Sequence, residues 1–288
     1  MLDLKLIRQD PEGVRAALAR RGEDAVAGLE RVVELDGRRR ALLPELEGLR
    51  AAQNEANARI RGAAGQDERE REIAAMREVA GRAKELEREL GEVEGALQEA
   101  LAPLPNLPDP TAADGPQDEL VRTVGEVPSF DFEVRDHLQL AGEEIDMDRA
   151  ARLSGSRFAY LLGELVFVEL ALVRWALEKL RHHGFTPVIP PVLVREQALY
   201  GTGFLPDTEQ QIYSLPDDDL FLVGTSEVPL ASLHAEEILD PDRLPLCYAG
   251  FSPCFRREAG AAGKDTRGIF RVHQFDKVEM FVYCVPEQ

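Results

Sequence analysis

The chain has 288 residues, of which 44% are hydrophobic, and carries 34 basic against 53 acidic residues for a net charge of −19. This length allows roughly two domains. The acidity argues against indiscriminate nucleic-acid binding, so any nucleic-acid partner must meet local basic patches. The three cysteines, Cys247, Cys254 and Cys284, are too few for a disulfide framework or a zinc knuckle. They favour a reduced, cytoplasmic protein.

The N-terminus predicts neither a signal peptide nor a membrane span. Residues 1–6 read MLDLKL, which lacks an apolar core of the length that a secretory signal needs. The long apolar stretch at 160–177 is interrupted by Glu164, Glu169 and Arg174. A transmembrane helix needs about 20 predominantly apolar residues, so no membrane partner is expected.

Residues 1–27 predict a short helical lead-in, with Pro11 near a helix start. A charged region follows over about 28–102, where apolar residues recur every seven positions. The two series are Leu35, Leu42, Leu49 and Ala56, then Met76, Ala83, Leu90 and Leu97. Turn residues at 61–67 separate them. The pattern predicts an antiparallel two-helix coiled-coil arm, each helix on the order of 50 Å long at 1.5 Å per residue.

Charge is unevenly distributed along this arm. Residues 31–62 hold seven arginines against five acids, whereas residues 67–100 hold six basic against eleven acidic residues. The arginines of the first helix could meet a nucleic-acid backbone. They could equally pair with acids one turn away on a solvated surface. A dimer tether or a scaffold element is a further alternative that charge does not decide.

Five prolines within 103–116 predict a linker, so we place one domain at 1–110 and a second at 111–288. The second begins with short strand-like pieces and then an apolar helix over about 157–183, which Gly184 ends. Several strands follow, with helices beside them but without βαβα alternation. This order predicts an α+β domain with a mainly antiparallel sheet.

Residues 246–256 and 268–285 predict two strands joined by a loop. Alternate residues of a strand share one face. The face holds Arg271, His273, Phe275, Lys277 and Glu279, with Arg256 and Glu258 on the partner strand. Residues 256–271 carry a net charge of +3 within this acidic chain. Arginines suit phosphate and a ring suits a base, although a surface hairpin with scattered ion pairs is the simpler alternative.

Six segments carry a resemblance: MLD at 1–3, DMDRAA at 146–151, SGSRF at 154–158, GTGFLP at 201–206, GTSEVPL at 224–230 and HQFDKVE at 273–279. Together they resemble bacterial-type seryl-tRNA synthetases, a family of class II aminoacyl-tRNA synthetases, over the whole chain. The resemblance implies a tRNA-binding helical arm followed by a class II antiparallel-sheet catalytic domain. Residues 184–191 resemble motif 1, which forms the dimer interface in that family, and 255–279 resemble motif 2.

The resemblance implies a serine–tRNA ligase that uses ATP and Mg²⁺. The carboxylate of L-serine would attack the α-phosphate of ATP, and the 3′-terminal ribose of serine tRNA would then take the seryl group. The arm would reach the long extra arm of that tRNA, and the loop 259–267 would lie near its acceptor end. A homodimer is implied as well. The family also charges the selenocysteine tRNA where one exists, which the sequence leaves open here.

The same resemblance implies roles for individual residues. Arg256, Glu258 and Glu279 form the catalytic set. The implied ATP contacts are Arg256, Arg257, Glu258, Arg271, Val272 and Phe275. The implied serine contacts are Thr225, Ser226, Glu227, Arg256 and Glu279. A site built to hydrogen-bond the serine hydroxyl would reject alanine. Without the resemblance, Thr225 and Glu227 read equally well as the cap of a following helix.

The family's third motif, with another ATP-binding arginine and the magnesium ligands, has no match up to residue 288. We therefore expect an incomplete catalytic domain with weak or absent activity on its own, and an unpaired edge on the strand 268–285. The alternatives are a truncated relative that binds tRNA through its arm without catalysis, and a coiled-coil scaffold with an inert globular half.

Overall fold

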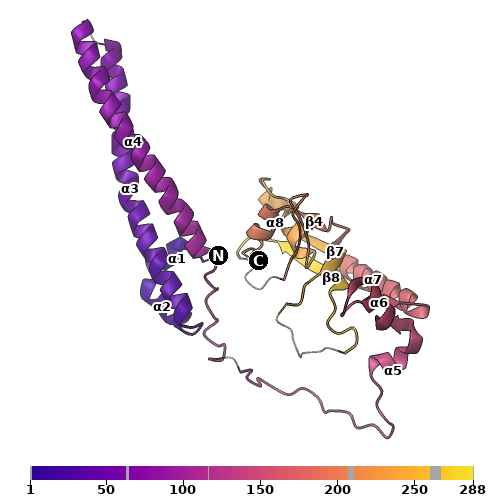
Figure 1. The fold of residues 1–288 in the computed structure, drawn as a ribbon. Helices are drawn as coiled ribbons and strands as arrows, with labels where there is room; N and C mark the ends of the chain where they lie inside the picture. The colour runs from indigo at the N-terminus through magenta and orange to yellow at the C-terminus, as the bar shows by residue number, and fades with distance from the viewer. Residues whose placement is uncertain (1, 63–64, 116, 207–210, 260–266, 288) are drawn as a thin grey trace. The chain divides into compact units, whose positions relative to one another are not determined.

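The computed structural model describes residues 2–287 except 63–64, 116, 207–210 and 260–266. The chain divides into two compact units, Met1–Gly125 and Glu126–Gln288 (Figure 1). Arg20 holds linker residues on both sides of the predicted domain boundary at 110 against the first unit. Its guanidinium donates to the carbonyls of Asp109 and Ala112 and pairs with Asp114.

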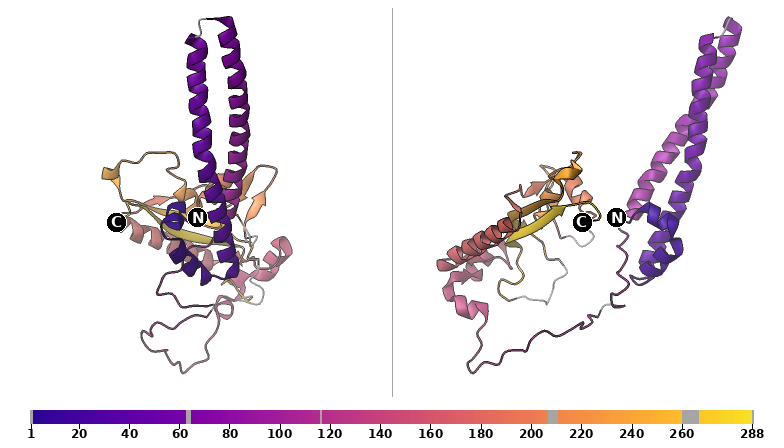
Figure 2. Two further views of the ribbon diagram at one scale, coloured as in Figure 1. Left: turned by 90° about the vertical axis from the view of Figure 1, so that its left-hand side faces the viewer. Right: turned by 180° about the vertical axis from the view of Figure 1, so that it is seen from behind.

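The first unit is a helical hairpin with two short helices at its base. These are α1 (Leu4–Gln9) and α2 (Pro11–Ala19), and the hairpin consists of α3 (Glu23–Gly62) and α4 (Gln66–Leu101). The two long helices lie side by side in every view (Figure 2). The predicted heptad positions form their seam, where Leu35, Leu42, Leu90 and Leu97 are buried. The 40 residues of α3 span about 60 Å, so the predicted arm is confirmed.

Ion pairs cross the seam between the two long helices. They are Arg38–Glu89, Arg39–Glu94, Glu45–Arg82, Arg50–Glu87 and Arg59–Glu72, with N–O distances of 2.8–3.2 Å. Most of these side chains are exposed, so each pair adds less than about 1 kcal/mol. Several arginines that the sequence offers to a nucleic acid therefore already have acidic partners on α4.

A buried carboxylate joins the base of the arm to α1. Asp36 of α3 is 4% exposed and accepts hydrogen bonds from the Arg8 guanidinium, from Nε at 2.8 Å and Nη2 at 2.5 Å. Arg40 adds a second cation, 3.2 Å away. The Arg8 hydrogen bond lowers the pKa of Asp36 below its ordinary value, outweighing burial, which would raise it.

The second unit begins with α5 (His137–Ala141), a 3-10 turn η1 (Gly142–Glu144) and α6 (Met147–Ser154). Two short strands, β1 (Ile145–Asp146) and β2 (Tyr160–Leu161), pair antiparallel around α6. The helix predicted over 157–183 is α7 (Glu164–His182), which starts later than expected. Gly163 at its N-cap has φ 58°, a left-handed conformation that stops the helix from extending backwards.

Two three-stranded sheets follow. The first has the order β3-β7-β8, where β3 (Thr186–Val188) runs parallel to β7 (Leu246–Phe255), and β7 runs antiparallel to β8 (Gln274–Tyr283). The second has the order β4-β6-β5 and is antiparallel: β4 (Leu193–Val194), β5 (Tyr213–Leu215) and β6 (Leu220–Leu222). The remaining elements are α8 (Glu196–Gly201), α9 (Glu227–Ala231) and η2 (Pro241–Arg243). The α+β prediction is confirmed.

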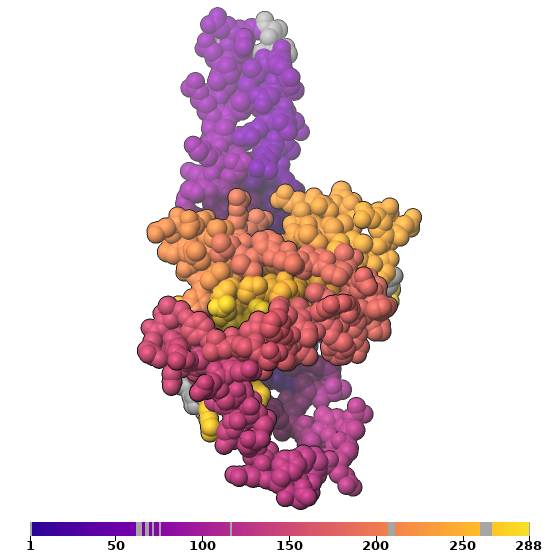
Figure 3. Space-filling view, turned by 90° about the vertical axis from the view of Figure 1, so that its right-hand side faces the viewer, coloured from indigo at the N-terminus to yellow at the C-terminus, as the bar shows by residue number. Residues whose placement is uncertain are grey.

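The second unit exposes much apolar surface. Helix α7 has no buried residue, and its exposed large side chains are Val166, Phe167, Val168, Leu170, Leu172 and Trp175. Figure 3 looks onto the side of the unit where α7 lies. Strand β8 is an edge within the described part of its sheet, and Met280 on it is 60% exposed. Among the described residues, no helix has the length and apolarity that a membrane crossing needs.

Candidate functional site

The hairpin that the sequence singles out is the β7–β8 ladder, but the second strand is shorter than expected. It begins at Gln274, opposite Phe255, and residues 268–273 form no strand. The expectation that strand pairing starts at 268 is wrong because these backbone groups have partners elsewhere. The Ile269 N–H donates to His137 Nε2 at 3.1 Å, and the His273 N–H donates to the Arg157 carbonyl at 3.0 Å.

Arg256, immediately after β7, is held from three sides. Its backbone N–H donates to the His273 carbonyl at 2.9 Å, and its Nε donates to the Gly224 carbonyl at 3.1 Å. Its guanidinium carbon lies 5.2 Å from the centre of the Phe275 ring. The Arg256 carbonyl accepts from His273 Nδ1 at 2.9 Å, which fixes the proton on that nitrogen. The arginine is therefore fixed in place against an aromatic face.

Glu258 and Arg271 form the second polar pair of the site. Arg271 Nη1 donates to Glu258 Oε2 at 2.7 Å, and the Glu258 side chain is 13% exposed. Glu258 has φ 50°, in the left-handed region that non-glycine residues rarely adopt. Such conformations persist where the surrounding structure enforces them, and they concentrate at functional sites. The Glu258 carbonyl also accepts from Arg157 Nη1 at 3.4 Å.

Three side chains meet on the same side of β8 as Phe275. Thr225 lies between β6 and α9 and is 2% exposed, while Lys277 and Glu279 come from β8. The Thr225 hydroxyl donates to Glu279 Oε2 at 2.7 Å and accepts from Lys277 Nζ at 2.9 Å. Lys277 also pairs with the Glu279 carboxylate. A hydroxyl, a carboxylate and an ammonium thus contact one another at this point.

The charge state of Glu279 follows from these contacts. Burial acts to raise the pKa of its carboxyl group, but the hydrogen bonds from Lys277 and Thr225, with the charges of Lys277 and Arg256, outweigh it. The pKa therefore lies below the ordinary value, and Glu279 is ionised at neutral pH. An ionised, partly buried carboxylate suits a cationic group such as an amino acid's ammonium.

Other predicted residues lie around this cluster with different surroundings. The Ser226 hydroxyl is fully buried and donates to the Gly250 carbonyl at 3.4 Å. Glu227 is exposed at the first position of α9, and its backbone N–H donates to the Thr225 hydroxyl at 3.2 Å. Arg257 is exposed, with its backbone N–H bonded to the Gln211 carbonyl. The ligand roles of these three residues stay predictions.

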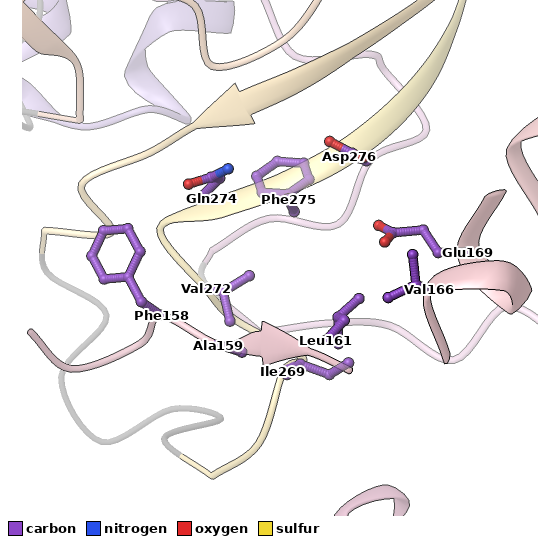
Figure 4. Close-up of a pocket in the computed structure, with 10 residues that line it drawn as sticks. All are labelled: Phe158, Ala159, Leu161, Val166, Glu169, Ile269, Val272, Gln274, Phe275 and Asp276. Atoms are coloured by element: carbon purple, nitrogen blue, oxygen red, sulfur yellow. The ribbon is translucent and has the colours of Figure 1, made fainter. Parts of the chain in front are cut away.

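A cavity of about 420 Å³ lies between β8, β2 and α7. Figure 4 shows its lining. Val272 and Phe275 line this cavity. Gln274 and Asp276 line it as well, although alternation along β8 puts their side chains on the opposite face from that of Phe275. Burial raises the pKa of both Glu169 and Asp276 on its wall. Arg256, Thr225 and Glu279 do not line the cavity, so we place the candidate site at their cluster instead.

Sequence reasoning missed several members of the site. Alternation put Lys277 on the same face as Phe275, but it gave no sign that Lys277 would contact Thr225. The Gly224 carbonyl that holds Arg256 and the Arg157 guanidinium that reaches Glu258 depend on tertiary packing. Most of the loop 259–267 lies outside the described residues. No group of three His, Cys, Asp or Glu suited to a metal occurs in the described part of the chain.

Family models match both units. The model described as the seryl-tRNA synthetase N-terminal domain matches residues 1–108. The model described as the tRNA synthetase class II core domain (G, H, P, S and T) matches residues 212–288. The serine–tRNA ligase of Nocardia farcinica is 48% identical over all of this chain and 69% of its own length. That of Streptomyces coelicolor is 49% identical, with the same coverage.

Solved structures similar to this chain include members of the same family. Seryl-tRNA synthetase from Pyrococcus horikoshii, complexed with ATP, is 42% identical with a TM-score of 0.88 over all of this chain and 70% of its own. The cytoplasmic serine–tRNA ligase from Naegleria fowleri, in complex with AMP, is 29% identical with a TM-score of 0.82 over all of this chain and 68% of its own. With an N-terminal helical arm, a class II sheet and relatives of this identity, the chain belongs to the seryl-tRNA synthetase family of class II aminoacyl-tRNA synthetases.

Proposed function

We propose that this chain activates L-serine with ATP and transfers the seryl group to the 3′ end of serine tRNA. The observation that carries the proposal is the Thr225–Glu279 pair beside Arg256. It offers a hydroxyl and an ionised carboxylate for an ammonium, next to a fixed guanidinium for an anion. The family membership and the ATP and AMP complexes of the related structures support the same assignment.

In the first step, a serine carboxylate oxygen attacks the α-phosphorus and pyrophosphate leaves. Two anions must approach each other, and charge increases on the phosphate oxygens in the transition state. The Arg256 guanidinium can offset both. Its Nε is occupied by the Gly224 carbonyl, while Nη1 and Nη2 have no hydrogen bond among the described residues. They are the atoms that would bridge the carboxylate and the α-phosphate.

The nucleotide would lie against Phe275, whose ring can stack on adenine. The Glu258–Arg271 pair would border the phosphates, with Arg271 supplying positive charge. The Val272 backbone would read an adenine edge. Magnesium normally bridges ATP phosphates and neutralises charge. The described residues present no metal cluster, so none of them is assigned as a magnesium ligand.

In the second step, a hydroxyl of the tRNA's terminal ribose attacks the seryl carbonyl carbon and AMP leaves. The arm formed by α3 and α4 would hold the tRNA by its long extra arm, reading shape more than bases. We also infer a homodimer through α7 and residues 184–191, supported by the exposed Phe167 and Trp175 on that helix. A charging assay with the selenocysteine tRNA tests whether that tRNA is also a substrate.

The test is serine-dependent exchange of labelled pyrophosphate into ATP by the purified chain and by Arg256→Ala, with alanine, threonine and cysteine as competing amino acids. Exchange that needs serine and is lost on substitution supports the proposal. Absence of exchange together with tight binding of serine tRNA supports the second candidate, a tRNA-binding relative without catalysis. The chain spans about 69% of the length of the curated relatives it matches. Failure of both assays contradicts the assignment.

A further inference from the structure

Lys277 occupies the position in the candidate serine site where a cationic substrate group would bind. Its Nζ lies 2.9 Å from the Thr225 hydroxyl and pairs with the Glu279 carboxylate. These are the two groups that the proposed function assigns to the ammonium of serine. The Lys277 side chain is 31% exposed, so it enters the site from a partly solvated position.

The hydrogen bonds of Thr225 leave no capacity for a ligand in this arrangement. A threonine hydroxyl offers one proton and two lone pairs. The proton goes to Glu279 Oε2 at 2.7 Å, while the lone pairs accept from Lys277 Nζ at 2.9 Å and from the Glu227 N–H at 3.2 Å. An ammonium brings only donors, so it can bond to Thr225 only if one donor leaves.

Of those two donors, one can move. The Glu227 N–H belongs to the first residue of α9, whose next three residues, Val228, Pro229 and Leu230, are buried. The Lys277 ammonium instead lies at the end of a flexible four-carbon stem. Two ammonium groups beside the one Glu279 carboxylate would also repel each other. Arrival of a ligand cation therefore favours departure of Lys277.

We propose that Lys277 is an internal counter-ion for Glu279, which holds Thr225 and Glu279 in their binding geometry and is displaced when the ammonium of the amino acid binds. The proposal rests on the proposed function for the identity of the incoming ligand. It makes Lys277 a positioning residue that determines how strongly the site prefers a ligand with an ammonium group over one without it. With a ligand that lacks the amino group, Lys277 stays and keeps the carboxylate neutralised.

The test compares two ligands on three proteins. One ligand is a seryl-adenylate analogue with a sulfamoyl group in place of the phosphoryl group, and the other is its counterpart without the α-amino group. Calorimetry measures their affinities for the full chain, Lys277→Met and Lys277→Arg. The amino preference is the ratio of these affinities. It should rise at least about tenfold in Lys277→Met, because the desamino ligand then leaves Glu279 without a cation, and should change less than about threefold in Lys277→Arg.

Two results would overturn the proposal. An unchanged amino preference in Lys277→Met with both ligands weakened equally would mean that Lys277 contacts a part they share. An unchanged amino preference with both affinities unchanged would mean that Lys277 is not displaced when the ammonium binds.

A ligand-free measurement separates this proposal from the proposed function. Lys277→Met should lower the midpoint temperature of thermal unfolding of the free chain. The double variant Lys277→Met/Glu279→Gln should recover much of this loss. Lys84→Met, at an exposed lysine, is the control. Recovery without binding of either ligand would keep the internal ion pair but refute the serine site and, with it, displacement. No loss in Lys277→Met would refute the counter-ion role itself.

Discussion

At the scale of single residues, the Asp36 carboxylate shows how much a buried charge depends on its partners. It is almost fully buried and is neutralised by Arg8 and Arg40. We expect Asp36→Asn to lower the free energy of unfolding of the first unit by about 1.5–3 kcal/mol, since hydrogen bonds to a charged group are lost. Urea denaturation followed by circular dichroism measures this. Glu30→Gln, in the exposed Arg15–Glu30 pair, is the matched control and should change little.

The same carboxylate predicts a pH dependence with a definite sign. Its pKa lies below the ordinary 3.8 in the folded chain, so the unfolded chain takes up the proton first as the pH falls. The stabilisation is fully present above pH 3.8 and is lost as the pH falls from there through the lower folded value. Asp36→Asn should flatten this part of the stability profile. An equally steep acid loss in the variant would contradict the assignment.

Gly268 predicts a steric effect next to the site. Its φ is +77°, and an added Cβ would lie 2.0 Å from His137 Nε2, the atom that accepts from Ile269. Gly184 has a similar φ of +88° but nothing within 4 Å. Gly184→Ala should therefore cost about 1–2 kcal/mol from backbone strain alone. Gly268→Ala should cost clearly more, as measured by thermal unfolding, and equal costs would mean that the His137 contact is unimportant.

The site residues were predictable to different degrees for physical reasons. Period-two alternation placed Phe275 and Glu279 on one face because it depends only on strand geometry. It could not predict that Arg271 would pair with Glu258, since both lie outside the strands where alternation applies. The short motif around Thr225 identified this residue as a candidate to bind the ligand. Its contact with Lys277 was not predictable from local sequence, because the two residues are 52 positions apart.

At the scale of elements, Pro44 is an unexpected feature of α3. It lies exposed inside the helix, where its missing N–H and its ring cost about 3 kcal/mol relative to other residues. We expect Pro44→Ala to stabilise the arm measurably. Pro11→Ala is the matched control, because Pro11 occupies the first turn of α2, where no N–H is needed. Circular dichroism during urea unfolding compares them, and a destabilised Pro44→Ala would contradict the expectation.

Elements with a local signal were predictable, and elements set by distant partners were not. The heptads of α3 and α4 carry their own period, so the arm and its turn were found within a few residues. The start of α7 was missed because residues before Gly163 pair as β2 with β1. The start of β8 was missed because residues 268–273 bond to α5 and to Arg157 instead of to β7.

At the scale of the whole molecule, the exposed face of α7 predicts self-association. Large apolar side chains gathered on one helix rarely stay in water on a monomer. Trp175→Glu should shift the chain from dimer towards monomer in sedimentation velocity, by at least about tenfold in dissociation constant. Arg174→Gln, beside it in an exposed ion pair with Glu178, should leave the dimer intact. A monomeric parent chain, or a Trp175→Glu variant that dimerises as tightly as its parent, would refute the inferred interface.

The charges across the seam of the arm have a consequence for how the chain finds its own partner helix. Four of the five described ion pairs across the seam place arginine on α3 and glutamate on α4, and Glu45–Arg82 has the opposite order. If two chains paired α3 with α3, arginines would face arginines, and α4 with α4 would oppose glutamates. Like helices therefore repel while unlike helices attract. The turn keeps α3 and α4 of one chain at high local concentration. Pairing of α3 with α4 within one molecule is therefore favoured over pairing between two newly made chains.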